Sequence, residues 1–204
     1  MRTRVKICGI RRLEDAMLAA ELGASAIGFI FWPESRRFID PYRARRIAAA
    51  VPPWLAPVGV FVDQPPEYVS GVAALLNLAA VQLHGDETTD RYAGGARRLI
   101  KAVPVGADFN RRIVDDLPAN VTVLLDAHDP ERRGGTGRVV DWTVASDVAR
   151  SRRTILSGGL TPENVRNAVE RVDPYGVDVS SGVEASPGVK DARKLRDFFA
   201  ALNG

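Results

Sequence analysis

LSGGL at residues 156–160 and DVSSGVE at residues 178–184 are the two stretches that decide the fold. Each begins as an apolar run, ends in small residues and precedes a segment with a helical pattern. The small residues at the two turns are Gly158, Gly159, Ser181 and Gly182. Because glycine lets backbone N–H groups come close to an anion, the two turns together predict a phosphate site.

The residues after the first turn strengthen this interpretation. Thr161 and Pro162 are typical of a helix start, with Thr161 as the N-cap and Pro162 in the first helical position. A helix N-terminus beside a glycine turn suits phosphate. Two ordinary glycine-rich connections would give the same pattern, and one turn alone does not distinguish them. Both turns together favour phosphate, which in (β/α)₈ barrels commonly lies at the loops after strands seven and eight.

Outward from these turns, the chain alternates between apolar runs and helical patterns. The expected strands are residues 4–10, 26–32, 56–63, 80–85, 99–105, 121–127, 154–157 and 177–180. The expected helices are residues 13–22, 41–51, 65–77, 87–92 and 110–117, two that begin near residues 141 and 161, and residues 191–202. Eight alternations predict an α/β fold in which a parallel sheet closes into a (β/α)₈ TIM barrel, as a single domain over residues 1–204. An open doubly wound sheet is the alternative, but no GxGxxG follows the first strand.

Composition narrows the class of protein. The 204 residues are 46% hydrophobic, with 28 Lys and Arg against 25 Asp and Glu. The net charge of +3 is too small to indicate nucleic-acid binding. The single cysteine, Cys8, excludes an internal disulfide and fits a reducing compartment. Because residues 1–4 lead straight into a strand and the apolar runs are short, we expect no signal peptide, no membrane segment and a cytoplasmic location.

Candidate catalytic residues stand where the expected strands end, because reactive groups in barrels cluster at the carboxyl ends of strands. They are Cys8, Arg37, Asp63, His84 and Asp126. Each has a plainer interpretation. Cys8 can be an inert core residue, Asp126 a turn aspartate and His84 a satisfied histidine. Asp63 is expected to be a supporting polar group.

Strand periodicity adds a buried ion pair to these candidates. Side chains alternate along a strand, so Lys6 and Cys8 share one face, as do Asp178 and Ser180, and Gln82 and His84. If Cys8 faces the pocket, Lys6 lies in the barrel interior and needs a partner. Strand eight closes the barrel beside strand one, so we expect Asp178, or a carboxylate deeper in the site, to pair with Lys6. That ammonium would also favour the Cys8 thiolate.

Several motifs occur together in one order. They are KICG (6–9), S-x-R (35–37), GVFVD (59–63), VQLHG (81–85), LLDA (124–127), GGTG (134–137), DW (141–142), LSGGL and DVSSGVE. This set closely resembles the phosphoribosylanthranilate isomerase family of tryptophan biosynthesis, from residue 6 to the last helix. The resemblance implies a barrel of the ribulose-phosphate-binding type, and an Amadori rearrangement without cofactor or metal. The substrate would be N-(5-phosphoribosyl)anthranilate and the product 1-(2-carboxyphenylamino)-1-deoxyribulose 5-phosphate.

The resemblance also implies roles for individual residues. Cys8 falls on the general base, Asp126 on the general acid, and Arg37 on the arginine that binds the anthranilate carboxylate. Many relatives carry S-P-R where this chain has Ser35-Arg36-Arg37, so Arg36 is a second candidate and Arg37 the preferred one. Asp126 must be protonated when it acts, so burial or nearby negative charge should raise its pKa.

Further expectations concern substrate binding and assembly. Phosphate binding is expected at the two glycine turns, with Asp178 and Ser180 also in contact with substrate. Residues 134–137 are expected to act as a lid hinge. We expect a small-molecule substrate, no nucleic-acid or membrane partner, and a monomer or homodimer.

Three other functions fit parts of the sequence. A histidine-pathway aminoaldose isomerase is similar but has Asp in place of Cys8. Indoleglycerol-phosphate synthase needs catalytic lysines on more strands than this chain supplies. A catalytically silent phosphate-binding barrel would not need both Cys8 and Asp126.

Overall fold

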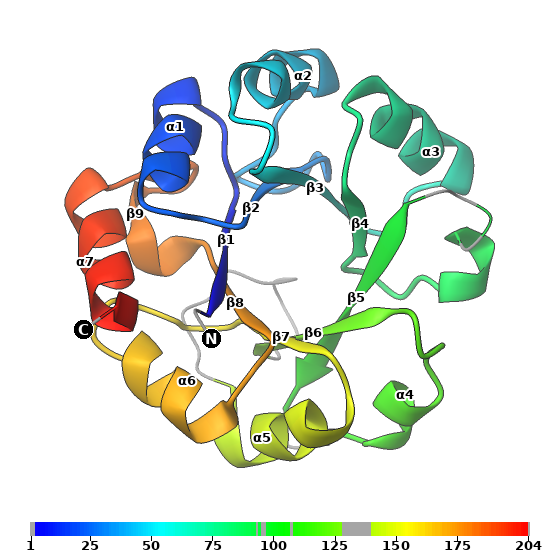
Figure 1. Ribbon diagram of the computed structural model, residues 1–204. Coiled ribbons are helices and arrows are strands. Elements are labelled where there is room, and N and C mark those ends of the chain that lie inside the picture. The colour runs from blue at the N-terminus through cyan, green and yellow to red at the C-terminus, as the bar shows by residue number, and fades with distance from the viewer. Residues whose placement is uncertain (1–2, 93, 95–96, 107, 128–139, 204) are drawn as a thin grey trace.

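The computed structural model describes residues 3–92, 94, 97–106, 108–127 and 140–203. Within this part of the chain, eight parallel strands pair in chain order and close into a barrel, seen end-on in Figure 1. The strands are β1 (Arg4–Cys8), β2 (Ala26–Ile30), β3 (Ala56–Phe61), β4 (Ala80–Leu83), β5 (Arg98–Val105), β6 (Thr122–Ala127), β7 (Thr154–Leu156) and β8 (Gly176–Val179). The (β/α)₈ prediction is confirmed.

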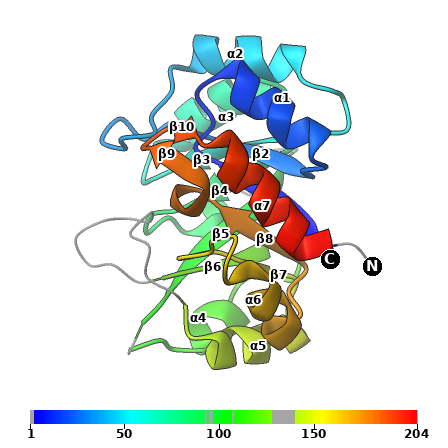
Figure 2. The same ribbon diagram turned by 90° about the vertical axis from the view of Figure 1, so that its left-hand side faces the viewer.

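Helices surround the barrel (Figures 1 and 2). They are α1 (Leu13–Glu21), α2 (Pro41–Ala50), α3 (Pro66–Leu75), α4 (Arg112–Asp115), α5 (Trp142–Ser151), α6 (Val165–Val172) and α7 (Ala192–Asn203). The segment expected as a fourth helix, residues 87–92, instead forms a 3₁₀ turn at Thr89–Tyr92. Among the described helices, none has the length and apolar character needed to cross a bilayer.

The start of α6 differs from the prediction. Thr161 and Pro162 lie in a turn, and the helix begins only at Val165. Asn164 holds this turn, because its Oδ1 accepts from the Thr161 N–H at 2.9 Å and its Nδ2 donates to the Gly159 carbonyl at 2.9 Å. An asparagine that binds nearby backbone groups competes with helical hydrogen bonds. Thr161 is therefore not the N-cap, and the glycine turn is fixed by the side chain of Asn164.

The connection from β8 to α7 contains structure that the sequence did not predict. A 3₁₀ turn at Ser181–Val183 leads into a two-stranded antiparallel hairpin, β9 (Glu184–Ser186) and β10 (Val189–Lys190). The hairpin projects from the barrel near α1 and α7 (Figure 2). It brings residues 184–190 beside the loops that follow β1 and β2, as their contacts below show.

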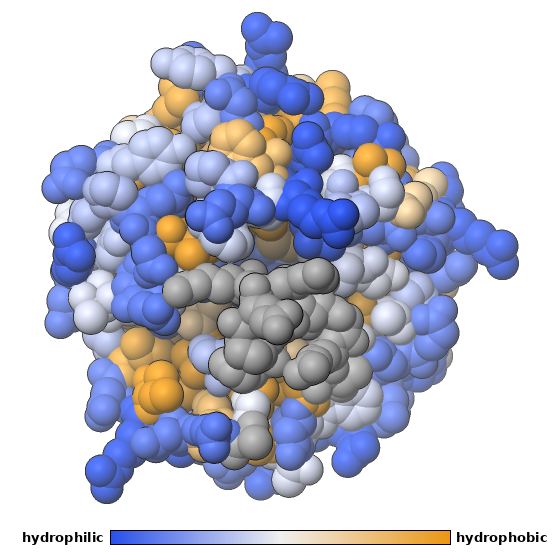
Figure 3. Space-filling view, turned by 180° about the vertical axis from the view of Figure 1, so that it is seen from behind, coloured by the Kyte–Doolittle hydropathy of each residue, from blue (hydrophilic) through white to orange (hydrophobic). Residues whose placement is uncertain are grey.

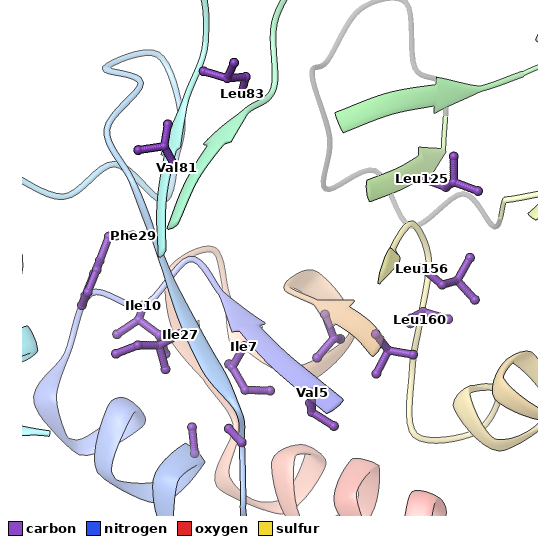
Figure 4. Close-up of a cluster of buried hydrophobic side chains, with 14 of the residues drawn as sticks. Val5, Ile7, Ile10, Ile27, Phe29, Val81, Leu83, Leu125, Leu156 and Leu160 are labelled. Atoms are coloured by element: carbon purple, nitrogen blue, oxygen red, sulfur yellow. The ribbon is translucent and has the colours of Figure 1, made fainter. Parts of the chain in front are cut away.

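Alternation along the strands divides the buried side chains into two layers. Val5 and Ile7 point from β1 toward the helices, and Ile27 does so from β2 (Figure 4). A second cluster fills the barrel itself, and its buried members are Val58, Ala80, Ile100, Ala102 and Leu124. Because a strand has period two, the same register that turns Val5 and Ile7 outward turns Lys6 and Cys8 inward.

Candidate active site

A cavity of about 740 Å³ opens at the carboxyl ends of the strands. Its lining includes most of the predicted site residues, namely Cys8, Arg37, Asp126, Gly158, Gly159, Asp178, Ser180 and Ser181. Gly182 is not part of the lining. Figure 3 looks at this end of the molecule and shows hydrophilic side chains around the centre of the face. Predicted residues from five separate segments of the chain therefore meet in one place.

Cys8 ends β1 inside the barrel, where a glycine leaves room for it. Its side chain is 6% exposed, and it pairs in register with Gly28 of β2. A Cβ built on Gly28 would stand 2.9 Å from the Cys8 sulfur and 3.1 Å from Cε of Lys6. Any larger residue at position 28 would displace the thiol. Gly28 is thus a site residue that the sequence analysis did not identify.

The expected ion pair is present below Cys8. Lys6 and Asp178 are register partners on β1 and β8, and Nζ of Lys6 lies 2.8 Å from Oδ1 of Asp178. Burial alone would lower the pKa of Lys6, but Asp178 and Cys8 together raise it above its ordinary value. Lys6 is therefore an ammonium at neutral pH, enclosed within the barrel. The predicted choice of Asp178 as its partner is confirmed.

The protonation of Cys8 differs from the expectation. Burial raises the pKa of the Cys8 thiol, and Lys6 lowers it, as predicted. Asp178 raises the pKa of Cys8 again and Lys190 lowers it, with a net rise above the ordinary value. Lys6 acts in the expected direction but does not outweigh the loss of solvation. In the free protein, then, Cys8 is a thiol rather than a thiolate at neutral pH.

Replacing Lys6 by methionine is expected to move the alkylation of Cys8 to higher pH. The ammonium is a cause that lowers the pKa of Cys8, so its removal leaves burial and Asp178 to raise that pKa further. The measurement is the iodoacetamide rate against pH. Asp178→Asn is the matched control, because it removes a charge that raises the same pKa and should move the profile to lower pH. An unchanged profile in Lys6→Met would disprove the electrostatic link.

Asp126 lies at the end of β6 and contacts a histidine. Its side chain is largely buried, and its Oδ2 lies 3.3 Å from Nε2 of His84. His84 in turn contacts Gln82, with 2.8 Å between Gln82 Nε2 and His84 Nδ1. If the Gln82 amide donates in this orientation, His84 carries its proton on Nε2 and presents it to Asp126. The histidine expected to be only a satisfied core residue is thus a direct neighbour of Asp126.

The turn after β7 has a backbone conformation that favours glycine. Gly158 has φ +79° and Gly159 has φ +65°, a region that residues with a Cβ rarely adopt. Gly182 joins the two turns, because a Cβ there would collide with the Leu160 carbonyl oxygen. Its role is therefore to let the loop after β8 pack on the loop after β7, although it does not line the cavity itself.

Gly182→Ala is expected to destabilise the protein by about 1–3 kcal/mol, because its new methyl group must displace backbone rather than a flexible side chain. Gly71→Ala is the control. Gly71 lies in α3 with nothing within 4 Å of an added Cβ, so alanine should stabilise by about 0.5–1 kcal/mol. Urea unfolding measures both. Equal stability of Gly182→Ala and the wild type would show that the two loops do not pack as described.

Both adjacent arginines line the cavity, and Arg37 is the more enclosed of the two. Its side chain is 12% exposed, whereas Arg36 is exposed to solvent. Gly9, with φ +76°, makes room for it, since a Cβ on Gly9 would stand 2.7 Å from Cδ of Arg37. This explains the glycine of KICG and supports the preference for Arg37. Glu184, which the sequence analysis did not identify, accepts two hydrogen bonds from Nε and Nη2 of Arg37.

The remaining candidates lie elsewhere. Asp63 is not part of the cavity lining, and its Oδ1 accepts from the Asp86 N–H at 2.7 Å, which is the supporting role expected for it. Residues 134–137, the expected lid hinge, lie outside the described residues. Within the described chain, no group of three His, Cys, Asp or Glu side chains is arranged to hold a metal ion.

Barrels with a polar cavity at the carboxyl ends of their strands, and with glycine turns after the last two, form a class of enzymes that commonly bind phosphorylated substrates. The model of one family within this class, N-(5′-phosphoribosyl)anthranilate isomerase, matches residues 5–201. The chain belongs to that family.

Individual relatives are similar over nearly their full length. The N-(5′-phosphoribosyl)anthranilate isomerase of Geobacter metallireducens is 47% identical over 196 residues, 96% of each chain. The crystal structure of the Thermotoga maritima phosphoribosyl anthranilate isomerase is 44% identical, with a TM-score of 0.89 over 99% of each chain. Another such isomerase, solved with reduced 1-(o-carboxyphenylamino)-1-deoxyribulose 5-phosphate, is 43% identical, with a TM-score of 0.85 over 99% of each chain.

Proposed function

We infer that this chain is an isomerase of tryptophan biosynthesis that converts N-(5′-phosphoribosyl)anthranilate to 1-(2-carboxyphenylamino)-1-deoxyribulose 5-phosphate. The observation that carries this conclusion is that Cys8, Asp126 and both glycine turns line one cavity in a chain of this family. The relative solved with the reduced form of that product supports the same substrate class, a phosphorylated sugar joined to anthranilate.

We propose that Asp126 acts as the general acid in the first step. Its proton goes to the ring oxygen of the ribose, the bond between that oxygen and C1 breaks, and the nitrogen lone pair forms a protonated C1=N Schiff base. The contact with His84 fixes the direction of the carboxyl group, with Oδ2 toward the imidazole. Correctly positioned acid–base groups of this kind contribute about 10²–10⁴-fold to a rate.

We propose that Cys8 acts as the general base in the second step. A thiolate removes the proton from C2, and the electron pair of that C–H bond forms C1=C2 while the nitrogen becomes neutral. The resulting enolamine tautomerises to the ketone. Although burial raises the pKa of Cys8 in the free protein, the Schiff base is a cation, and a nearby cation favours the thiolate. Once the Schiff base has formed, the Cys8 thiol can release its proton to solvent through the open cavity, and the resulting thiolate is the base of the second step.

The other cavity residues are proposed to bind the substrate. Gly158, Gly159 and Ser181 are proposed to form the phosphate site, and Gly182 to contribute by holding the two turns together. Ser180 would lie beside the phosphate, and Asp178 on the cavity wall near the sugar. Arg37 is proposed to bind the anthranilate carboxylate. Anchoring both ends holds C1 and C2 between Cys8 and Asp126, which lowers the entropic part of the barrier.

The organisation of the protein is also a proposal. We propose a single domain over residues 1–204 and a cytoplasmic location. The assembly would be a monomer or a homodimer, and the isomerase of Thermotoga maritima is dimeric.

A fluorescence assay tests the proposed function. Anthranilate and ribose 5-phosphate condense in solution to give the substrate, and the purified protein should quench the substrate fluorescence as product forms. The aminoaldose of histidine biosynthesis serves as the comparison substrate. Turnover of the histidine-pathway compound alone, or of neither compound, would contradict the assignment.

A further inference from the structure

Glu184 is a buried carboxylate in the cavity wall that contacts two basic side chains, Arg37 in the wall and Lys190 behind it. Its Oε1 and Oε2 accept from Nε of Arg37 at 2.9 and 3.1 Å, and its Oε2 accepts from Nη2 at 2.8 Å. Its Oε1 also accepts from Nζ of Lys190 at 2.8 Å and from the N–H of Gly188 at 3.2 Å. The Glu184 side chain is 4% exposed and that of Lys190 is fully buried. Both carboxylate oxygens of Glu184 therefore accept hydrogen bonds from these groups.

Glu184 faces two basic side chains, those of Arg37 and Lys190. Burial lowers the pKa of Lys190, whereas Glu184 raises it, with a net fall below the ordinary value. Burial opposes ionisation of Glu184, but Arg37 and Lys190 together hold its pKa below the ordinary value, so it is a carboxylate at neutral pH. Of the two basic side chains, only Arg37 lines the cavity, and a guanidinium stays charged. A ligand carboxylate in the cavity would therefore meet the guanidinium of Arg37.

The hydrogen bonds show which edge of Arg37 is free to receive that carboxylate. Glu184 occupies the edge formed by Nε and Nη2. Among the described residues, Nη1 of Arg37 has no hydrogen-bond partner, and Arg37 lines the cavity. A guanidinium held along one edge presents the rest of its planar fork in a fixed direction, which costs little further side-chain entropy on binding.

We propose that Glu184 is a positioning residue for substrate specificity: it fixes the guanidinium of Arg37 so that its free edge recognises the aryl carboxylate. The proposal rests on the function proposed above and deepens it, because it assigns selection of a carboxylated aryl group to the β9–β10 hairpin. Glu184 acts through Arg37 and does not touch the reacting atoms. The same connection between β8 and α7 carries Ser181, so this segment takes part in the sites proposed for both anionic ends of the substrate.

The test compares the affinities of two ligands for the wild type and three variants, measured by titration calorimetry. The ligands are reduced 1-(2-carboxyphenylamino)-1-deoxyribulose 5-phosphate and the same compound with phenylamino in place of carboxyphenylamino. For the wild type, loss of the ligand carboxylate should weaken binding about tenfold or more. For Glu184→Gln, removal of the ligand carboxylate should weaken binding only about threefold or less, because Glu184 no longer holds the guanidinium of Arg37.

Two further variants distinguish positioning of Arg37 from a change in the charge of the cluster and from general damage to the structure. Glu184→Gln combined with Lys190→Met removes the buried amine together with its carboxylate partner, so no lysine is left buried without that partner. The double variant should behave like Glu184→Gln. Asp15→Asn is the matched control. Asp15 is equally buried and holds Arg12, at 2.9 and 2.6 Å, as well as the Lys190 N–H, but it does not contact Arg37. It should keep the wild-type preference.

The outcomes are distinguishable. The carboxylate effect is the loss of affinity on removing the ligand carboxylate. If this effect in both Glu184 variants equals or exceeds that of the wild type, the inference is overturned, even if overall affinity falls. An effect lost equally in Asp15→Asn also overturns it, because the hairpin would then matter only as structure. If the wild type binds neither ligand, the proposed function itself fails and the inference fails with it.

Discussion

Replacing Cys8 by alanine is expected to lower kcat for the isomerisation by about 10²–10⁴-fold, the usual contribution of a general base. Alanine removes the sulfur without adding volume beside Gly28, so the barrel should remain folded and the two glycine turns should remain in place. Affinity for the reduced product analogue should therefore change little. The fluorescence assay gives kcat, and calorimetry gives the affinity.

A serine at position 8 is the control for the chemical role of the thiol. Cys8→Ser keeps a hydrogen-bonding group of similar size, but a hydroxyl is a much weaker acid than a thiol and should restore little of the rate. Turnover by Cys8→Ala near that of the wild type would remove Cys8 from the mechanism. Loss of turnover together with loss of analogue binding would instead indicate damage to the site as a whole.

Asp126→Asn is expected to reduce kcat by a similar factor, about 10²–10⁴-fold. The amide has nearly the same shape and can still contact His84, but it has no acidic proton to give to the ring oxygen. Binding of the reduced analogue should persist, because that ligand is already open and needs no proton transfer.

The contact between Asp126 and His84 adds a second comparison. His84→Asn should lower kcat less than Asp126→Asn, since it removes the group that orients the acid and leaves the acid itself. A result in the opposite order, with His84→Asn the more severe, would place the essential proton on the imidazole and contradict the assignment of Asp126. The pH dependence of kcat in both variants would show which group titrates.

The parts of this molecule that follow from strand periodicity could be predicted from the sequence. Once β1 and β8 are neighbours in a closed parallel sheet, period-two alternation places Lys6, Cys8 and Asp178 on one face, and the ion pair follows. The glycine turns are predictable for a similar reason, because positive φ at Gly158 and Gly159 requires residues without a Cβ.

Other parts depend on contacts that sequence spacing does not reveal. Glu184 looks like an exposed residue of a polar loop until Arg37, 147 positions earlier, is seen to bind it. The start of α6 depends on the side chain of Asn164, which hydrogen-bonds to the backbone of Thr161 and Gly159 rather than to solvent. The net effect on the pKa of Cys8 depends on how completely the barrel excludes water, which residue identities alone do not give.

The pairing of Lys6 with Asp178 has a consequence for synthesis of the chain. The two residues are separated by 172 positions, so a ribosome makes the lysine long before its carboxylate. Until β8 has left the exit tunnel, the lysine has no carboxylate from β8 to pair with, and enclosing an unpaired ammonium would be costly. Burial of β1 between its two neighbours must therefore wait for nearly the whole polypeptide. We therefore expect β1 to stay exposed in the nascent chain until translation is almost complete.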